Sequence, residues 1–489
     1  MTMTAPLAYL AIDMGASSSR AVLGVLDPHP EGARMRMAQV ARFRTPMVEK
    51  DGHLYWDIGE LWSEMLGAIR KAVQLEPSIR SISIDSWAVD YVSLDANGVP
   101  LALPFAYRDP RTKGRMAEAS AKLGADRLYA RTGLQSLELN TLPQILAELE
   151  TTPAFARETA KRVTIADYFL SKLSGVLAIE RTMASTTQLY DVTTRTWAVD
   201  LITEIGDDPA RWPAIVEPGT VLGALATDVG IETTTLPRIV AGCSHDTAAA
   251  VAAIPAHGDG PWAYLCLGTW ALIGAELNAP ILDVRAREEG FTNETGFGGT
   301  IRFLKNRMGM WILEECLREW SEAGERPQYD ALFADAARAP SMPCLIDVNA
   351  PAFAERGDMV ANIGSACRAV GMQPPSDRGA LVRLLLESVA ESYARTLREL
   401  DALTGAPAPV VHMVGGAIRH PLVNQLIADA CNRRVVAGPD EATALGNLLV
   451  QASALGDLPP GQSVRDVARR STVCTEYTPT SSSDVVLTR

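Results

Sequence analysis

The sequence predicts an α/β protein built from two large, related domains. Its 489 residues exceed what a single hydrophobic core usually supports. Strand-like and helix-like segments alternate as far as about residue 255, and the strand–glycine turn–strand pattern that opens the chain returns near residue 263. A repeat of this length indicates a duplicated domain rather than a solenoid.

The first expected domain covers residues 1–255 and opens with two strands. Residues 8–12 and 19–26 are apolar runs, and the residues between them are small and polar, which is typical of a strand–turn–strand unit. Apolar residues at helical spacing predict a helix over residues 61–73. Short apolar runs predict further strands at residues 81–84, 91–94 and 237–241.

The second expected domain covers residues 260–455. Proline and glycine cluster at residues 254–261, which marks the boundary. The domain opens with two apolar runs, residues 263–267 and 271–275, which predict strands on either side of a turn at Gly268-Thr269.

The end of the second domain has a different pattern. A predicted strand at residues 410–414 leads through Gly415-Gly416 into a predicted helix at residues 421–430. Paired glycines at such a junction let the backbone approach a ligand closely. Residues 456–489 then form a polar C-terminal tail, which we expect to be loosely held.

The composition argues against some classes of partner and indicates the compartment in which the protein is found. Lysine and arginine number 45 against 58 acidic residues, and the net charge of −13 argues against nucleic acid or an anionic membrane as a partner. No apolar run reaches the roughly 20 residues of a membrane span, and the N-terminus lacks the pattern of a signal peptide. The seven cysteines have no C-x-x-C spacing, which favours reduced thiols. We therefore expect a cytoplasmic protein.

Several common catalytic motifs are absent. The sequence contains no Gly-Lys dipeptide, so it has no G-x-x-x-x-G-K-[ST] phosphate loop. It also lacks H-E-x-x-H and G-x-S-x-G. A P-loop enzyme, a zinc protease of that type and an ordinary serine hydrolase are all poor interpretations.

Residues 12–20 (IDMGASSSR) are the first positive signal. Asp13 ends a predicted strand, where a carboxylate can hold Mg²⁺ through water. The small and hydroxyl-bearing residues that follow, together with Arg20, can bind phosphate oxygens. A polar hairpin turn without a ligand explains the segment equally well.

Residues 241–251 (AGCSHDTAAAV) are the second signal. Asp246 lies between a predicted strand and an alanine-rich helix. In one interpretation Asp246 or Ser244 only caps that helix, an effect of about 1 kcal/mol. In the other, Asp246 takes a proton from a hydroxyl group during phosphoryl transfer. His245 can hydrogen-bond a sugar, although a lone histidine is more often structural.

Two further segments place polar residues beside predicted strands. Asn306, just before a predicted helix at residues 308–317, suits either hydroxyl recognition or a helix cap. Trp87, with Asp85 and Asp90, suits either a sugar ring stacked on an indole or a tryptophan buried in the core.

Taken in order, seven phrases of the sequence resemble those of the FGGY carbohydrate kinases. They are IDMGASSSR, IDSWAVDYVSLD with AYRDPRT, ADYFLSKLSG, SHDTAAAV, YLCLGTWALIGAE, LKNRMGMWILEE and VGGAIRHPLVNQLIADAC. The resemblance implies two ribonuclease-H-like (actin-like ATPase) domains, with ATP and a sugar in the cleft between them. Within the family, the phrases are most similar to those of members that phosphorylate L-rhamnulose.

The resemblance also implies roles for single residues. Asp246 matches the catalytic proton acceptor, and Mg²⁺ is implied between the β- and γ-phosphates of ATP. The implied sugar-contacting residues are Ala88, His245, Asp246, Thr247 and Asn306. The implied ATP-binding residues are Ala16, Ser17, Ser18, Ser19, Arg20, Thr269, Glu314 and Gly416.

Three positions depart from the pattern of these relatives. Ser19 and Ala88 stand where glycine is usual, and Glu314 stands where a glutamine is expected near the nucleotide. An acid close to ATP is electrostatically unfavourable unless it faces ribose hydroxyls or water. Ala88 adds a methyl group beside the implied sugar site, so L-fuculose and L-xylulose remain alternative substrates.

The expected partners are therefore ATP and a small sugar, and the chain is expected to be a monomer or a homodimer. A protein of another class, an actin-like ATPase without sugar kinase activity, would have the same nucleotide-binding turns. Trp87, Asn306 and the His245-Asp246 pair, in matching order, argue against that class.

Overall fold

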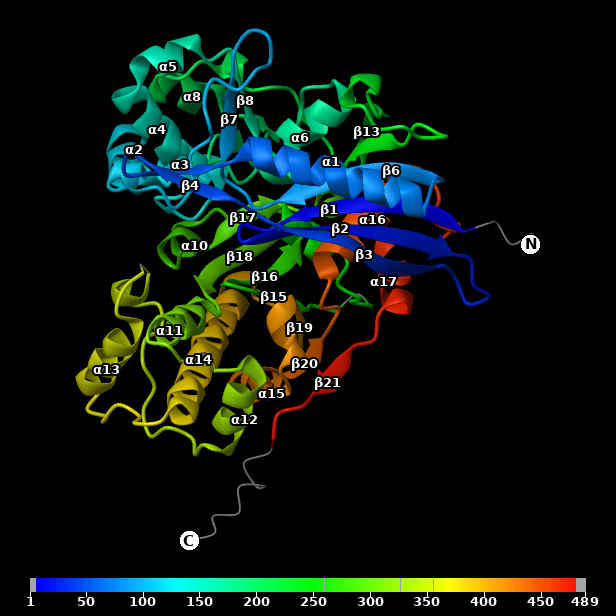
Figure 1. Cartoon of the computed structure of the whole chain (residues 1–489). Helices are drawn as coiled ribbons and strands as arrows, with labels where there is room; N and C mark the ends of the chain where they lie inside the picture. Colours follow the sequence, from blue (N-terminus) through cyan, green and yellow to red (C-terminus); the bar gives the residue numbers. More distant parts are fainter. Residues whose placement is uncertain (1–5, 259, 326, 355, 481–489) are drawn as a thin grey trace. The chain divides into compact units, whose positions relative to one another are not determined.

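Two β-sheets organise the chain, and helices pack against both (Figure 1). The computed structural model describes residues 6–258, 260–325, 327–354 and 356–480. The chain divides into two units, the first made of residues 1–257, 276–303 and 442–472, and the second of residues 258–275, 304–441 and 473–489. Asp259, within the predicted boundary region, lies outside the described residues.

The first unit is built on a six-stranded sheet with the order β13-β14-β6-β1-β2-β3. Its three central strands, β14, β6 and β1, are parallel, and the outer strands are antiparallel to their neighbours. The strands of this sheet are Leu7–Met14 (β1), Ser18–Asp27 (β2), Arg34–Arg44 (β3), Ile79–Ser86 (β6), Thr220–Ala224 (β13) and Arg238–Ala241 (β14).

Short strands and helices complete the first unit. The short strands are Met47–Lys50 (β4), His53–Trp56 (β5), Tyr91–Leu94 (β7), Lys161–Thr164 (β8), Ile179–Glu180 (β9), Tyr190–Asp191 (β10), Thr196–Trp197 (β11), Ile215–Val216 (β12) and Thr292–Thr295 (β17). The helices are Ile58–Leu75 (α1), Arg115–Leu123 (α2), Ala125–Thr132 (α3), Thr141–Thr151 (α4), Pro153–Glu158 (α5), Ile165–Ser174 (α6), Arg181–Ala184 (α7), Val199–Ile205 (α8), Asp246–Ala252 (α9), Val284–Glu288 (α10), Ala442–Ala454 (α16) and Val464–Ser471 (α17).

Alternating residues of β1 face two separate hydrophobic cores. Leu10 and Ile12 join the core that contains the buried residues of α1 and α6. Tyr9 and Ala11 join the core formed with α9, α16 and α17. Because side chains of a strand alternate between the two faces of its sheet, a run of apolar residues in β1 indicates a strand that is covered on both sides.

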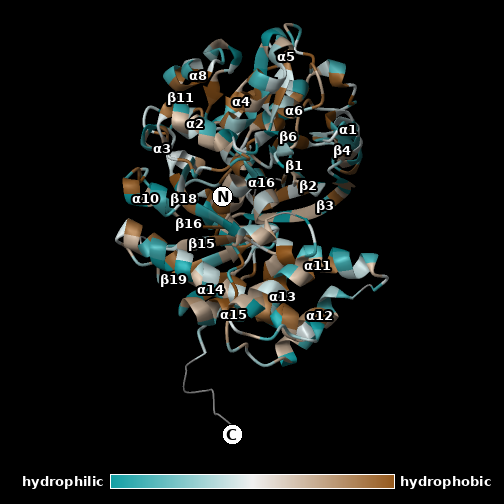
Figure 2. Cartoon of the chain, turned by 90° about the vertical axis from the view of Figure 1, so that its left-hand side faces the viewer, coloured by the Kyte–Doolittle hydropathy of each residue, from teal (hydrophilic) through white to brown (hydrophobic). Residues whose placement is uncertain are grey.

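The predicted helix over residues 61–73 is α1, and it begins slightly earlier. The Asp57 carboxylate accepts hydrogen bonds from the backbone N–H groups of Gly59 and Glu60, which caps the helix. Its buried residues, which include Leu61 and Met65, recur at three- and four-residue intervals. In Figure 2 hydrophobic (brown) and hydrophilic (teal) residues both occur on the helices, as such one-sided packing requires.

The segment after residue 455 is not loosely held throughout, so this expectation is wrong for α17. Ser463 and Asp466 form a capping box at the start of the helix. Val464, Val467 and Ala468 are buried in the core shared with β1. The sequence did not predict this helix because charged residues separate the few apolar residues of α17.

The second unit is built on strands that lie in one sheet in the order β18-β16-β15-β19-β20-β21. The strand directions repeat those of the first sheet. β16 is antiparallel to β15, as β2 is to β1. β15, β19 and β20 are parallel to one another, as β1, β6 and β14 are. The predicted duplication is therefore confirmed. The further elements are Ala263–Leu267 (β15), Trp270–Leu277 (β16), Ile301–Met308 (β18), Val410–Val414 (β19), Arg434–Ala437 (β20), Thr475–Tyr477 (β21), Trp311–Glu322 (α11), Tyr329–Arg338 (α12), Met359–Ala369 (α13), Arg378–Thr404 (α14) and Pro421–Cys431 (α15).

Among the described residues, no helix combines the length and the apolar character that crossing a lipid bilayer requires.

Candidate active site

Three carboxylates lie at the carboxyl ends of the parallel strands of the first unit. Asp13 of β1 is in register with Asp85 of β6. Ser86, the next residue of β6, forms a β-bridge with His245, which directly precedes Asp246. Because carboxyl ends of parallel strands meet at one edge of a sheet, this topology gathers the three acids, which is where ligands bind in many α/β folds.

The electrostatic environment differs among these acids. Asp85 is fully buried, and burial together with the charge of Asp13 holds its pKa well above the usual range. Asn447 of α16 donates to Asp85 Oδ2, whereas Oδ1 has no partner among the described residues. Asp246 is less enclosed, with 31% of its side chain exposed. Desolvation and the nearby charge of Asp13 raise the pKa of Asp246 to about 7, close to the value that suits a base at neutral pH.

Asp13 and Arg20 form an ion pair across the turn between β1 and β2. Arg20 Nε and Nη2 donate to Asp13 Oδ2 over 2.9 and 2.7 Å. Asp13 is buried, and a quarter of the Arg20 side chain is exposed. The structure thus brings together the predicted metal-binding acid and the predicted phosphate-binding cation. The positive charge of Arg20 compensates the negative charge of Asp13, one of the three carboxylates.

The predicted phosphate-binding turn is held in place from the segment after β3. Thr45 Oγ donates to the carbonyl oxygen of Gly15 over 2.6 Å, and Ser19 is bonded to the same threonine over 2.9 Å. Ser17 is exposed, while Ser19 is fully buried. Ser18 accepts a hydrogen bond from Arg42. The hydroxyl of Ser19 therefore supports the turn rather than facing solvent.

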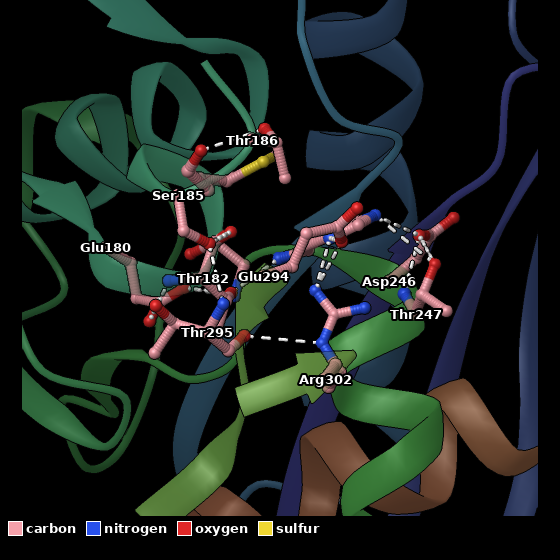
Figure 3. A network of polar contacts seen from close by, with 12 residues as sticks. Glu180, Thr182, Ser185, Thr186, Asp246, Thr247, Glu294, Thr295 and Arg302 are labelled. Atoms are coloured by element: carbon pink, nitrogen blue, oxygen red, sulfur yellow. Dashed lines mark hydrogen bonds and ion pairs between the residues drawn. The ribbon is translucent and has the colours of Figure 1, made fainter. Parts of the chain in front are cut away.

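Asp246 is the first residue of α9 and is joined to a chain of polar contacts (Figure 3). The backbone N–H and the hydroxyl of Thr247 both donate to Asp246 Oδ1, over 2.6 and 3.0 Å. Thr247 Oγ lies 3.2 Å from His245 Nε2, and Arg302 Nη2 lies 2.9 Å from His245 Nδ1. Arg302 Nη2 also donates to Glu294 over 2.8 Å. Thr247 is the second residue of α9, so the Asp246 carboxylate also satisfies one N–H of the first turn of its helix, as the capping interpretation predicted.

The backbone before Asp246 is fixed by a second group of buried residues. Glu180 accepts hydrogen bonds from the backbone N–H of Ser244 and from Thr182. Thr182 Oγ accepts the backbone N–H of His245 over 3.1 Å, and Asp167 accepts the hydroxyl of Ser244 over 3.1 Å. Burial raises the pKa of Glu180 to about 8 and that of Asp167 to about 6. These contacts determine where α9 begins and hence where Asp246 lies.

Trp87 is a core residue, as one of the two interpretations of its segment predicted. Its indole N–H donates to Asp90 over 2.9 Å, and its ring lies 4.4 Å from that of Trp56. It is buried, so its ring is not available as an open stacking platform. Ala88 beside it is half-buried. Val89 follows with φ of 70°, a backbone conformation that a β-branched residue rarely adopts.

In the second unit, the predicted nucleotide residues cluster around the β15–β16 turn. Thr269 Oγ donates to the Glu314 carboxylate, with 3.3 Å to each oxygen. The carbonyl oxygen of Gly268 accepts the N–H of Met310 at the start of α11. A Cβ atom at Gly309 would clash with the carbonyl oxygens of this turn, so only glycine allows the approach.

The Gly415-Gly416 pair follows β19, as predicted. Gly415 has φ of 101°, and a Cβ atom there would lie 2.6 Å from the carbonyl oxygen of Leu267. Gly416 begins a short 3₁₀ turn, Gly416–Arg419, and a Cβ atom at Gly416 would meet no atom within 4 Å. The backbone of Gly416 is therefore open to a ligand.

Asn306 does not lie between a strand and a helix, and that part of the prediction is wrong. It is the sixth residue of β18, and α11 begins only at Trp311. Its neighbours Lys305 and Arg307 both pair with Glu399 of α14. The strand continues through Met308 because its buried apolar face does, so the predicted helix at residues 308–317 starts later.

Several residues of the first-unit site were not predicted from the sequence. Arg302, Glu294, Glu180 and Thr182 were not singled out, although all four are buried and bonded to the segment that carries Asp246. Charged residues within strands are usually exposed, so the alternation of apolar and charged residues in β18 concealed Arg302. A buried Arg–Glu pair cannot be recognised from spacing alone.

The acids of the first unit fit a hard cation that retains part of its water. No group of three or more histidine, cysteine, aspartate or glutamate residues within the described ranges is arranged to hold a metal ion directly. Mg²⁺ commonly binds through one or two carboxylates together with substrate phosphates and water. The carboxylate oxygens of Asp13 are donors of the type that Mg²⁺ prefers.

The chain is similar to known proteins over nearly its whole length. Residues 8–253 match the N-terminal domain, and residues 263–455 the C-terminal domain, of the FGGY family of carbohydrate kinases. A rhamnulokinase of Klebsiella pneumoniae is 38% identical over 97% of this chain and 95% of its own, and one of Bacteroides thetaiotaomicron is 36% identical over 96% of each. The solved structure of a ligand-bound xylulose kinase from Lactobacillus acidophilus matches 97% of this chain and 94% of its own, with a TM-score of 0.78 at 19% identity.

Proposed function

The chain belongs to the FGGY family of carbohydrate kinases, and from this premise we propose that it phosphorylates L-rhamnulose with ATP to give L-rhamnulose 1-phosphate. Phosphorylation of a sugar by ATP follows from the family. The choice of ketose is supported by rhamnulokinases that are 36–38% identical over nearly the whole chain.

Asp246 is proposed as the base that accepts the proton of the attacking hydroxyl group. This assignment is carried by one observation: both hydrogen bonds that reach its carboxylate end on Oδ1. Among the described residues none donates to Oδ2, so that oxygen can accept a substrate hydroxyl. In phosphoryl transfer a protein mainly positions the reactants, neutralises charge and supplies such a base.

The turn between β1 and β2 is proposed to bind phosphate oxygens of ATP. Ala16 and Ser17 offer small side chains at an accessible turn, and Thr45 keeps the turn in one conformation. Arg20 contributes positive charge while it remains paired with Asp13. Bound near Asp13, Mg²⁺ would neutralise charge on the phosphates.

Thr269 and Gly416 of the second unit are proposed to contact the nucleotide. The turn that contains Thr269 is fixed against the start of α11, and the backbone of Gly416 is open. Glu314 is proposed to lie close to the nucleotide because Thr269 is bonded to it.

Sugar contacts are proposed for Ala88, Thr247 and Asn306. Ala88 is half-buried beside Trp87 and is the candidate for discriminating among ketoses. His245 is a weaker candidate than the resemblance implied, because both of its ring nitrogens have protein partners.

The base is tested with the Asp246→Asn variant. We expect phosphoryl transfer to be abolished, while ATP binds with near-normal affinity in a calorimetric titration. Asp440→Asn, an exposed carboxylate in an ion pair with Arg419, is a control that should retain full turnover. Turnover retained in Asp246→Asn would remove Asp246 from its proposed role.

The substrate is tested with a panel of ketoses, compared by kcat/KM at saturating Mg²⁺–ATP. We expect L-rhamnulose to be among the best substrates, ahead of L-fuculose and L-xylulose. A clear preference for another ketose would refute L-rhamnulose but not the kinase. ATP hydrolysis without any sugar, accompanied by polymer formation, would instead indicate an actin-like ATPase.

A further inference from the structure

Arg302 is the fully buried cation next to the candidate base, and the resemblance gives it no role. Its Nη2 group donates two hydrogen bonds, one to His245 Nδ1 over 2.9 Å and one to Glu294 over 2.8 Å. Its Nε donates to the carbonyl oxygen of Thr295. The side chain is therefore held in one orientation, with its charge directed at the segment that carries Asp246 (Figure 3).

The contact with Arg302 determines which nitrogen of His245 carries the proton. A guanidinium group only donates hydrogen bonds and keeps its protons in proteins. A proton on His245 Nδ1 would place two donors face to face at 2.9 Å, and Glu294 Oε2, the acceptor on that side, is farther away at 3.4 Å, so Nδ1 accepts from Arg302. Burial and the charge of Arg302 also hold the pKa of His245 well below its usual value, so the ring is neutral. A neutral imidazole carries one proton, which must then be on Nε2.

The proton on His245 Nε2 determines the next two hydrogen bonds. Nε2 lies 3.2 Å from Thr247 Oγ and 3.4 Å from Asp246 Oδ1, so the nearer threonine oxygen accepts its proton and Nε2 is the donor in that contact. The single proton of the Thr247 hydroxyl is then free to point only at Asp246 Oδ1, 3.0 Å away. Each bond in the series fixes the direction of the following one.

We propose that Arg302 is a positioning residue that sets the direction of the hydrogen bonds from His245 through Thr247 to Asp246. With both donors of Thr247 directed at Oδ1, the other oxygen of Asp246 is kept as the acceptor for the substrate hydroxyl. Arg302 does not touch the reacting atoms in this arrangement and acts through His245. The proposal rests on the proposed function only for the identity of Asp246 as the base.

Several charged groups act on Asp246 and must be considered together. Asp13 and Asp85 are acids close enough to repel its negative charge, and Arg20 is paired with Asp13. Arg302 is the cation contributed by β18, and it forms an ion pair with Glu294. Because Arg302 opposes the repulsion by Asp13, its removal makes the ionised form of Asp246 less favourable.

The first test determines the tautomer of His245 in the wild-type enzyme without substrate. Ser244-His245 is the only Ser-His pair in the sequence, so labelling serine with ¹³C and histidine with ¹⁵N identifies this ring without any mutation. Long-range ¹H–¹⁵N NMR spectra at neutral pH are expected to show a protonated Nε2 and an unprotonated Nδ1. A proton on Nδ1, or a doubly protonated ring, would overturn the proposal.

The second test replaces Arg302 and measures kcat/KM for the sugar against pH. In Arg302→Met we expect the acid limb to move to higher pH by roughly one unit, because a buried cation that favours ionised Asp246 is lost. Arg302→Lys keeps the charge, so its acid limb should stay near that of the wild type while kcat falls. An unchanged acid limb in a folded Arg302→Met variant would overturn the proposal.

The matched control is Arg162, which is also fully buried and paired with acids, Glu148 and Asp207. Arg162→Met should lower the melting temperature without moving the acid limb. The two proposals fail separately: turnover in Asp246→Asn removes the base even if His245 has the expected tautomer, whereas the wrong tautomer refutes only the role of Arg302.

Discussion

Ser19 and Thr45 share a hydrogen bond of 2.9 Å that joins β2 to the residue following β3. Thr45 donates its own proton to the carbonyl oxygen of Gly15, so Ser19 must be the donor to Thr45. The serine thus supports the turn from behind, at a position where the resemblance predicts glycine. This finding gives a structural reason for one of the three departures in the sequence.

We predict that Ser19→Ala affects stability more than catalysis. One buried hydrogen bond is lost, so the free energy of unfolding should fall by about 1 kcal/mol in urea titrations, while kcat stays near the wild-type value. Thr45→Val removes both bonds, frees the carbonyl of Gly15 and should raise KM for ATP. Equal KM values for ATP in Thr45→Val and the wild type would show that this threonine does not order a nucleotide-binding turn.

We predict that Glu314→Gln binds ATP more tightly than the wild type. The carboxylate is exposed and bonded to Thr269, so its negative charge would repel phosphates near that turn. An exposed charge of this kind contributes about 0.5–1 kcal/mol, so KM for ATP should fall by roughly two- to fivefold at low salt and by less at high salt. Glu322→Gln, at the other end of α11, is the control and should leave KM unchanged. A KM that does not respond to Glu314→Gln would place the nucleotide away from this residue.

We predict that kcat/KM for the sugar rises with pH to a plateau, with its midpoint near pH 7. The pKa of Asp246 is raised to about 7, and only the ionised form can accept a proton. Activity should therefore fall roughly tenfold for each pH unit below the midpoint. His245 does not explain such a midpoint, because its pKa is held well below its usual value. Rates measured from acid to neutral pH that show no limb would contradict Asp246 as the base.

We predict that Asp90→Asn is strongly destabilising. The Asp90 carboxylate accepts from the indoles of Trp56 and Trp87, from the Gln144 amide and from a backbone N–H. An asparagine would turn an N–H₂ group toward these donors, and we expect the free energy of unfolding to fall by about 3 kcal/mol. The measurement is urea unfolding followed by tryptophan fluorescence.

The control for this prediction is Asp95→Asn, at a half-buried residue that directly follows β7 and accepts backbone N–H groups. It should cost less than 1 kcal/mol, about the value of one exposed hydrogen bond. Equal stability of Asp90→Asn and the wild type would show that the buried carboxylate is not needed to satisfy the two indoles.

The sequence predicted best the features that depend on neighbouring residues. The strands at residues 91–94, 263–267 and 410–414 have the bounds of β7, β15 and β19, because an apolar run between turn residues is a local signal. The turn before Arg20 and the strand-to-helix junction at Asp246 were found for the same reason. Both features lie at the carboxyl edge of the parallel strands of the first unit.

The sequence could not predict contacts between distant segments. Arg302 meets His245 across 57 residues, and Asn447 meets Asp85 across 362. Such pairs leave no signal among neighbouring residues of the sequence. A charged residue in a predicted strand is usually expected to face solvent. Asn306 was misplaced because its glycine-rich flank suggested a loop, whereas pairing within the sheet extends β18 to Met308.

The packing of α16 on the first sheet has a consequence for how the protein is made. Leu448 and Gln451 of this helix contact β2 and β1, strands that leave the ribosome long before the helix does. At about 5–20 residues per second, synthesis of the 362 residues that separate Asp85 from Asn447 takes roughly 20–70 s. During that time the face of the nascent sheet that carries the buried acid lacks α16, and α9 is the only helix of its core already synthesised for the last part of the interval. Slowing translation between the two segments should therefore increase the demand of the newborn chain for chaperones.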